Sequence, residues 1–128
     1  MTIDGKILAR ARKRLKNIRL ENERALGLRR AEAYEKNPNI ARREKELRRT
    51  MLEVVSSALS GGGDIEDIRD RNLSLQSALI YELTVSGFPP DYLDEKPNCP
   101  KCGDTGYVSG EMCSCLKELY AEEQVLEL

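Results

Sequence analysis

The chain has 128 residues, a net charge of −1 and only 5% aromatic residues, while 34% of its residues are charged. That composition provides little bulk for a large globular core and suits long amphipathic helices better than a compact enzyme. Histidine, the commonest general base, is absent from the sequence, and so is a glycine-rich phosphate-binding motif ending in lysine. We therefore expect no catalytic activity in this chain.

The charges are divided unevenly along the sequence. Residues 1–50 hold 16 Lys and Arg against seven Asp and Glu, whereas residues 51–128 hold five against 15. This pattern indicates either a basic surface for an anionic partner, or basic and acidic parts that pair with each other or lie on solvated helix faces. A secretory signal and an apolar run of about 18 residues are both missing, so we expect a cytoplasmic protein that does not enter a membrane.

A first long helix is predicted over residues 3–36. Its apolar residues recur at spacings of four, four and three, which places them on one face. These residues are Ile7, Ala11, Leu15 and Ile18. Gly27 is expected to kink this helix or to end it early. Residues 37–39 then interrupt the pattern, because the residue before Pro38 avoids helical angles and a proline suits a helix start.

Two further helices are predicted to form an antiparallel hairpin. The second runs from Pro38 to about Leu59, and the third follows an N-cap at Asp64, with the glycine run 61–63 as the turn. Apolar residues recur at alternating three- and four-residue spacings, as in a coiled-coil seam. They are Leu47, Met51, Val54 and Ala58 in the second helix, and Ile65, Ile68, Leu75 and Leu79 in the third. Asn72 lies inside the third-helix series, either as a buried amide that fixes the register or as a partly exposed polar position.

The sequence divides into four predicted segments. Gly87 ends the third helix, and the prolines after it stiffen an extended linker that Phe88, Tyr92 and Leu93 are expected to pin against the hairpin's end. The segments are a basic N-terminal helix (1–37), an antiparallel helical hairpin (38–87), a proline-containing linker (88–96) and a cysteine module (97–128).

The last segment carries the strongest chemical signal. Its cysteines form a Cys-x2-Cys pair and, ten residues later, a Cys-x-Cys pair; they are Cys99, Cys102, Cys113 and Cys115. This spacing in a reducing compartment is typical of a tetrahedral zinc site. The alternatives are disulfides, which are disfavoured because adjacent pairing would close a small strained ring, and an iron–sulfur cluster. Four thiolates saturate a tetrahedral ion, so we expect one structural Zn²⁺ with no open position for a substrate.

A small module around this site completes the predicted fold. Ser109-Gly110 predicts a short β-hairpin that returns the second cysteine pair to the first, and residues 114–128 predict a helix. The expected fold class is therefore mainly α: long helices with an antiparallel helical hairpin, followed by a small treble-clef or ribbon-like zinc module.

The order of these features resembles a known family. From about Ile40 onward, and most specifically over residues 88–124 with CPKCGDTGYV followed by CSCLK, the chain is similar to the N-terminal domain of bacterial and phage replicative helicase loaders of the DnaC/DnaI type. The resemblance implies docking on the hexameric replicative helicase during primosome assembly, with the four cysteines as zinc ligands. An AAA+ ATPase domain follows in that family, so we expect this chain to be either the N-terminal domain alone or a stand-alone relative. CPKCGDTG also echoes cysteine-rich chaperone repeats, but a single copy with a shortened second pair disfavours that class.

Two functional hypotheses involve the first helix. In a protein-interaction domain its apolar stripe would bind the helicase, unless the stripe packs on the protein's own hairpin. The stripe residues are Ile7, Leu8, Leu15 and Ile18. In a zinc-stabilised nucleic-acid-binding protein, basic residues of this helix would contact the phosphates of single-stranded DNA. Those residues are Arg10, Arg12, Lys13 and Arg14. Self-association through the helices is a further expectation.

Overall fold

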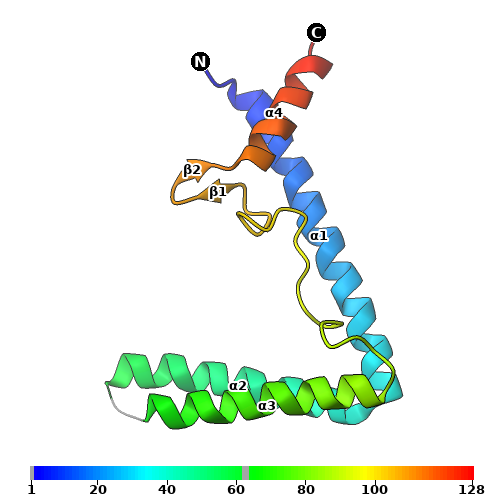
Figure 1. The fold of residues 1–128 in the computed structure, drawn as a ribbon. Coiled ribbons are helices and arrows are strands. Elements are labelled where there is room, and N and C mark those ends of the chain that lie inside the picture. Colours follow the sequence, from blue (N-terminus) through cyan, green and yellow to red (C-terminus); the bar gives the residue numbers. More distant parts are fainter. Residues whose placement is uncertain (1, 62–63) are drawn as a thin grey trace. The chain divides into compact units, whose positions relative to one another are not determined.

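The computed structural model describes residues 2–61 and 64–128 and is mainly helical (Figure 1). Three long helices come first: α1 (Gly5–Lys36), α2 (Pro38–Ser60) and α3 (Ile65–Val85). A two-stranded antiparallel hairpin of β1 (Tyr107–Val108) and β2 (Glu111–Met112) follows, and α4 (Ser114–Leu126) ends the chain. This confirms the predicted fold class. No helix in the described ranges combines the length and the apolar character needed to cross a bilayer.

The chain folds as two compact units that cut across the predicted segments. Unit 1 joins the residues up to Leu26 with Glu95–Leu128, and unit 2 is Gly27–Asp94. The first helix is shared between them, because its N-terminal part packs on the cysteine module while its last turns pack on the hairpin. Gly27 does not end α1, which continues to Lys36.

Unit 1 has a small core between α1 and α4. The apolar face of α1 meets Leu116 and Tyr120 of α4, and the tyrosine hydroxyl accepts a hydrogen bond from the backbone N–H of Asp4 at 2.8 Å. Gly106 lies against this core with a φ of +89°, where an added Cβ would sit 2.9 Å from Leu15 Cδ2 and 3.0 Å from Leu116 Cδ2. Glycine at this position therefore allows the cysteine module to approach α1 closely.

Unit 2 is held together at the base of its hairpin. A buried cluster there joins the end of α1, the start of α2, the end of α3 and the linker; its members are Ala33, Ile40, Leu83 and Leu93. Phe88 and Tyr92 stack with ring centroids 4.7 Å apart and pack on this cluster, so the linker is pinned as predicted. Asn37 caps α2 through a bond from the Asn39 N–H, and its own amide donates to Glu82 at 2.8 Å on α3.

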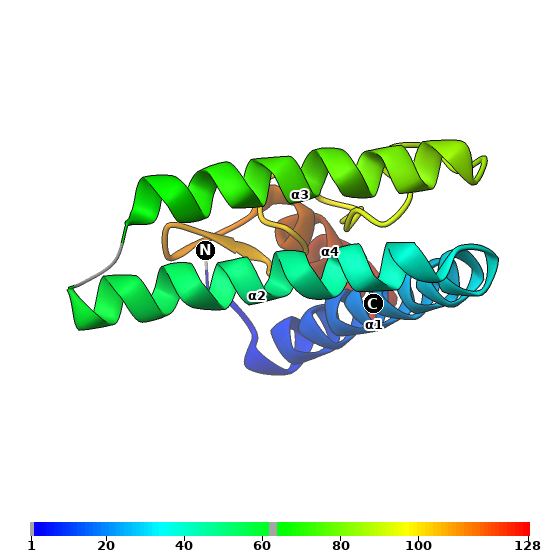
Figure 2. The same cartoon turned by 90° about the horizontal axis from the view of Figure 1, so that it is seen from below.

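The hairpin itself pairs α2 and α3 side by side in opposite directions (Figures 1 and 2). Asp64 caps α3 by accepting from the Asp67 N–H, as predicted, and Gly61 takes the left-handed conformation after α2. The other two glycines of the predicted turn, Gly62 and Gly63, lie outside the described residues.

The predicted seam is correct for most of α3, and in α2 it is correct at Leu47 and Val54 but wrong at its other two positions. Ile68 is buried and Asn72, Leu75 and Leu79 are half-buried, although Ile65 at the start of the series is exposed. In α2, however, Thr50 is 3% exposed and Met51 is 61% exposed, and Ala58 is exposed as well.

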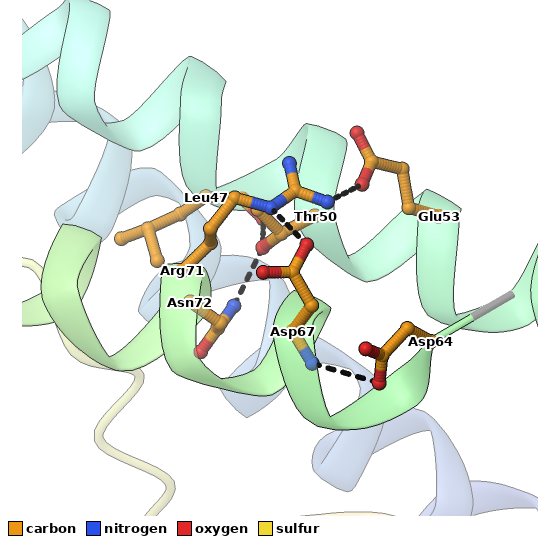
Figure 3. A network of polar contacts seen from close by, with 7 residues as sticks. All are labelled: Leu47, Thr50, Glu53, Asp64, Asp67, Arg71 and Asn72. Carbon is orange, nitrogen blue, oxygen red and sulfur yellow. Dashed lines mark hydrogen bonds and ion pairs between the residues drawn. The ribbon is translucent and has the colours of Figure 1, made fainter.

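Hydrogen bonds explain why Thr50 and not Met51 faces the seam. Thr50 Oγ1 donates to the Leu47 carbonyl at 2.7 Å and accepts from Asn72 Nδ2 at 2.6 Å (Figure 3), so its hydroxyl is satisfied inside the seam. Asn72 therefore acts in the seam as a half-buried partner of Thr50.

Candidate metal centre

The four cysteine sulfurs converge on one point of unit 1. All four Sγ atoms lie within 4.8 Å of one another, with Cys99 and Cys113 at 3.7 Å and Cys102 and Cys115 at 3.5 Å. Sulfurs around a tetrahedral ion at about 2.3 Å are separated by about 3.8 Å, whereas a disulfide bond is about 2 Å long. The thiols are free, and their spacing fits one metal ion coordinated by all four.

The first cysteine pair sits on a tight turn with N–H groups directed inward. Gly103 N–H donates to the Cys99 carbonyl at 2.9 Å, and Gly106 N–H donates to the Cys102 sulfur at 3.4 Å. Both Gly103 and Gly106 have positive φ, which the turn requires. Such N–H···S bonds stabilise thiolate charge and orient the sulfur.

Asp104 is the structural residue of this site that the sequence analysis missed. Its side chain is almost fully buried, at 2% exposure for the residue, and its φ is +63°. One carboxylate oxygen accepts from the Cys99 N–H at 2.7 Å; the other accepts from the Asn98 N–H at 2.9 Å and from the Asn22 amide of α1 at 3.1 Å. Asp104 thus ties the first cysteine turn to α1. The available signal was an Asp directly after Cys-x2-Cys-Gly, since Asp tolerates left-handed angles better than most residues.

The second cysteine pair is delivered by the β-hairpin and the start of α4, as predicted. Tyr107 pairs with Met112 across the hairpin, and the turn residues Ser109 and Gly110 both have positive φ. Cys113 occupies the N-cap position of α4, so the second pair lies at a helix N-terminus. The partial positive charge there offsets part of the negative charge of the thiolates.

The protein environment shifts the pKa values of the thiols in different directions. Burial raises the pKa of Cys102, but hydrogen bonds from the Gly106 N–H and from neighbouring thiols outweigh it, and the pKa falls to about 6. The Cys115 N–H lowers the pKa of Cys113, whereas burial raises the pKa of the Cys115 thiol. The cluster therefore favours partial deprotonation, which is the state that binds a cation.

Two of the four residues predicted to bind a partner are buried in unit 1, and the other two are partly buried. Ile7 and Leu15 are buried against α4, and Leu8 and Ile18 are partly buried on the same core. The sequence analysis offered two roles for the stripe: binding a partner or packing on the protein's own hairpin. The stripe does pack on the protein itself, but on α4 and not on the hairpin. It leaves little free surface for a docked protein.

Most of the basic residues proposed for nucleic acid also have internal partners. Arg10 pairs with Glu127, the C-cap residue of α4, and Arg14 pairs with Glu122 at 2.7 Å and with Glu123 at 3.4 Å. We call these three acids the acidic side of α4. Arg12 donates to the Tyr107 hydroxyl and lies over that ring, 5.4 Å from its centroid. Lys13 is exposed. Part of the excess of basic residues in the N-terminal part of the sequence thus pairs with acidic residues of the C-terminal part within unit 1.

Comparisons with protein-family models, with curated proteins and with solved structures gave no match to this chain. The fold and the site define a mainly helical protein with a cluster of four cysteines whose positions fit a metal ion.

Proposed function

We propose that this chain is a non-catalytic adaptor domain, stabilised by one Zn²⁺ ion, that docks on a hexameric replicative DNA helicase during primosome assembly. The observation that carries the proposal is the convergence of four thiols within the segment that resembles helicase loaders. The resemblance to helicase loaders implies that these four cysteines bind one metal ion together. The separations between their sulfur atoms fit a single tetrahedral ion.

Zinc is the proposed metal because of the donor set. Four sulfur ligands select soft or borderline ions, and Zn²⁺ accepts a regular tetrahedron without redox chemistry. Cys99 and Cys102 would hold it from the first turn, and Cys113 and Cys115 from the start of α4. With all four positions filled by protein, the ion would supply folding free energy and no catalytic function.

The outward face of α1 is the proposed docking surface. Because Ile7 and Leu15 face α4, the opposite face carries the exposed residues, at spacings of three, four and four. They are Lys13, Lys16, Leu20 and Arg24. An exposed leucine between cations suits an acidic groove with an apolar floor, and the cations would accelerate the encounter. Asn22, a half-buried residue of the same helix, anchors this part of α1 to Asp104, so the metal site would keep the docking helix in place.

Co-elution of the full chain with a purified hexameric bacterial replicative helicase tests this proposal. Lys13→Glu with Lys16→Glu should weaken the complex by at least tenfold at low salt and make its remaining affinity less dependent on salt. Arg42→Glu with Lys45→Glu is the matched control, because it makes the same charge change at the same spacing on exposed positions of α2. Failure of the wild-type chain to bind, or equal weakening by both double variants, would contradict the proposal.

Direct binding of single-stranded DNA is the second candidate function. The exposed cations of α1 favour it, whereas the pairing of Arg10 and Arg14 with the acidic side of α4 reduces the charge available for phosphates. DNA binding measured against salt concentration separates the two candidates. Affinity for DNA at low salt that Lys13→Glu with Lys16→Glu removes, in a chain that does not bind the helicase, would favour this second function.

A further inference from the structure

One side of α2 faces away from α3 and is exposed from the middle of the helix to its end. Thr50 marks the opposite side, because its hydroxyl accepts a hydrogen bond from Asn72 of α3 (Figure 3). Leu52 is rotated by about 200° from Thr50 around the helix axis and is 70% exposed. Residues three, four and seven positions from Leu52 share its side of the helix. We call this side the outer face of α2; its large side chains, all exposed, are Lys45, Arg48, Arg49, Leu52, Val55 and Leu59.

Toward the base of the hairpin, the outer face of α2 is basic. Lys45, Arg48 and Arg49 form no ion pair within the described ranges 2–61 and 64–128. The neighbouring acids of α2 bind elsewhere: Glu44 contacts side chains of α1, and Glu46 pairs with other arginines of α2. Among the described residues of α2, none on the outer face is Asp or Glu. The protein therefore supplies no direct partner for these three cations.

Toward the tip of the hairpin, where α2 ends, the outer face is aliphatic. Leu52 is 70% exposed, Val55 is 56% exposed and Leu59 is 84% exposed. The first of them lies one helical turn beyond the last cations, so the two halves of the face follow each other along one line. Scattered exposed leucines are ordinary, but three neighbouring aliphatic side chains on one face beside unpaired cations indicate a surface for a partner.

An anionic lipid surface meets both halves of this face. Lipid phosphates adjoin acyl chains, and basic helices with large aliphatic side chains bury those side chains about 5–10 Å into this boundary. A nucleic acid would meet only the basic half, because bases stack on aromatic side chains and the described outer face has none. The three successive aliphatic side chains also distinguish this face from the docking surface of α1, where a single leucine lies between cations.

We propose that the outer face of α2 attaches this chain to an anionic membrane surface. The three cations would bind lipid phosphates, and the aliphatic side chains near the tip would lie at the boundary between headgroups and acyl chains. Attachment of this kind requires no segment that crosses the bilayer. The inference is independent of the proposed function, because the docking surface of α1 and the outer face of α2 share no residue.

The acidic start of α3 is compatible with this attachment. Its carboxylates are Asp64, Glu66, Asp67 and Asp70. Packed helices lie about 8–10 Å apart, and the outer face points away from α3. These acids would therefore stay about one Debye length behind α2 at physiological ionic strength, where their repulsion by anionic lipids is largely screened.

Co-sedimentation of the metal-loaded, reduced full chain with lipid vesicles tests the inference. Vesicles made of equal amounts of phosphatidylglycerol and phosphatidylcholine should bind the chain, and vesicles of phosphatidylcholine alone should not. Arg48→Glu with Arg49→Glu should weaken the binding at least about 25-fold, because each cation close to an anionic surface strengthens binding about fivefold. The matched control is Lys13→Glu with Lys16→Glu, which changes the net charge equally at exposed positions of α1 and should retain most of the binding.

The position of the outer face in the lipid is measured with tryptophan, which the chain lacks. Emission of Leu52→Trp should shift to shorter wavelengths when anionic vesicles are added, and brominated acyl chains should quench it. Leu73→Trp is the matched control, because Leu73 is a 53% exposed leucine of α3 that lies outside the outer face of α2. Its emission should change little. All four variants alter exposed residues, so their helical signal should equal that of the wild-type chain.

Four outcomes would overturn the inference. A wild-type chain that does not bind anionic vesicles even at low salt has no such surface. Equal weakening by the two charge variants would mean that net charge, and not the outer face, attracts the chain. Binding without a spectral shift of Leu52→Trp would exclude contact of the aliphatic half with lipid. Binding to an oligonucleotide but not to vesicles, removed by Arg48→Glu with Arg49→Glu, would assign the cations to nucleic acid.

Discussion

Replacing Gly106 by alanine should destabilise unit 1 through two separable effects. The φ of +89° is unfavourable for any residue with a Cβ, at about 1–2 kcal/mol. The added carbon would also lie 2.9 Å and 3.0 Å from the side chains of Leu15 and Leu116, and overpacking of a core of this kind costs about 1–3 kcal/mol. The expected total is about 2–5 kcal/mol, a large share of the stability of a small domain.

Gly110→Ala separates the two effects. Gly110 also has a positive φ, +81°, but an added Cβ there meets nothing within 4 Å. Urea unfolding of the zinc-loaded chains, monitored by the near-ultraviolet signal of the tyrosines, gives the two free energies of unfolding. Gly106→Ala should lose about 1–3 kcal/mol more than Gly110→Ala. Equal losses would refute the close approach of α1, α4 and the cysteine module at this point.

Three further outcomes are expected from buried polar groups. Asp104→Ala removes the acceptors of two backbone N–H groups at the first cysteine turn and of the Asn22 amide on α1, and it should weaken zinc binding about 10- to 100-fold in a chelator competition. An unchanged affinity would contradict its positioning role. Thr50→Val should cost about 1–2 kcal/mol by leaving the Asn72 amide without its seam partner, and Thr50→Val with Asn72→Leu should recover part of that loss in a double-mutant cycle. Burial, together with the bond to Glu44, raises the pKa of Tyr34 from 10.0 to about 12, so the associated stability should be present below pH 10 and lost as the pH rises toward 12. An absorbance titration in which Glu44→Gln fails to lower the pKa of Tyr34 would contradict that cause.

Periodicity and spacing were enough to predict the elements of this fold. The helix boundaries followed from Pro38, from the cap at Asp64 and from the glycine before the linker, because each of these acts on the backbone locally. The cysteine cluster followed from ligand spacing and a hairpin signal, which are also local. Four thiols separated by up to sixteen positions could thus be assigned to one site.

Three features could not be predicted from periodicity and spacing alone. In α2, Met51 and Thr50 are neighbours, and only the Asn72 amide on another helix decides which of them faces the seam. The stripe of α1 was correctly assigned to one face, but whether that face met a partner, the hairpin or α4 depended on the position of the cysteine module. The link from Asp104 to α1 was missed because its bond to Asn22 joins residues 82 positions apart in the sequence.

Metal analysis of the chain purified under reducing conditions tests the central claim most directly. Native mass spectrometry combined with elemental analysis should find one zinc ion per chain, with four protons displaced and all four thiols protected from alkylation. A chain without bound metal, with iron in place of zinc, or with its sulfurs joined as disulfides would contradict the assignment of this cluster as a structural zinc site.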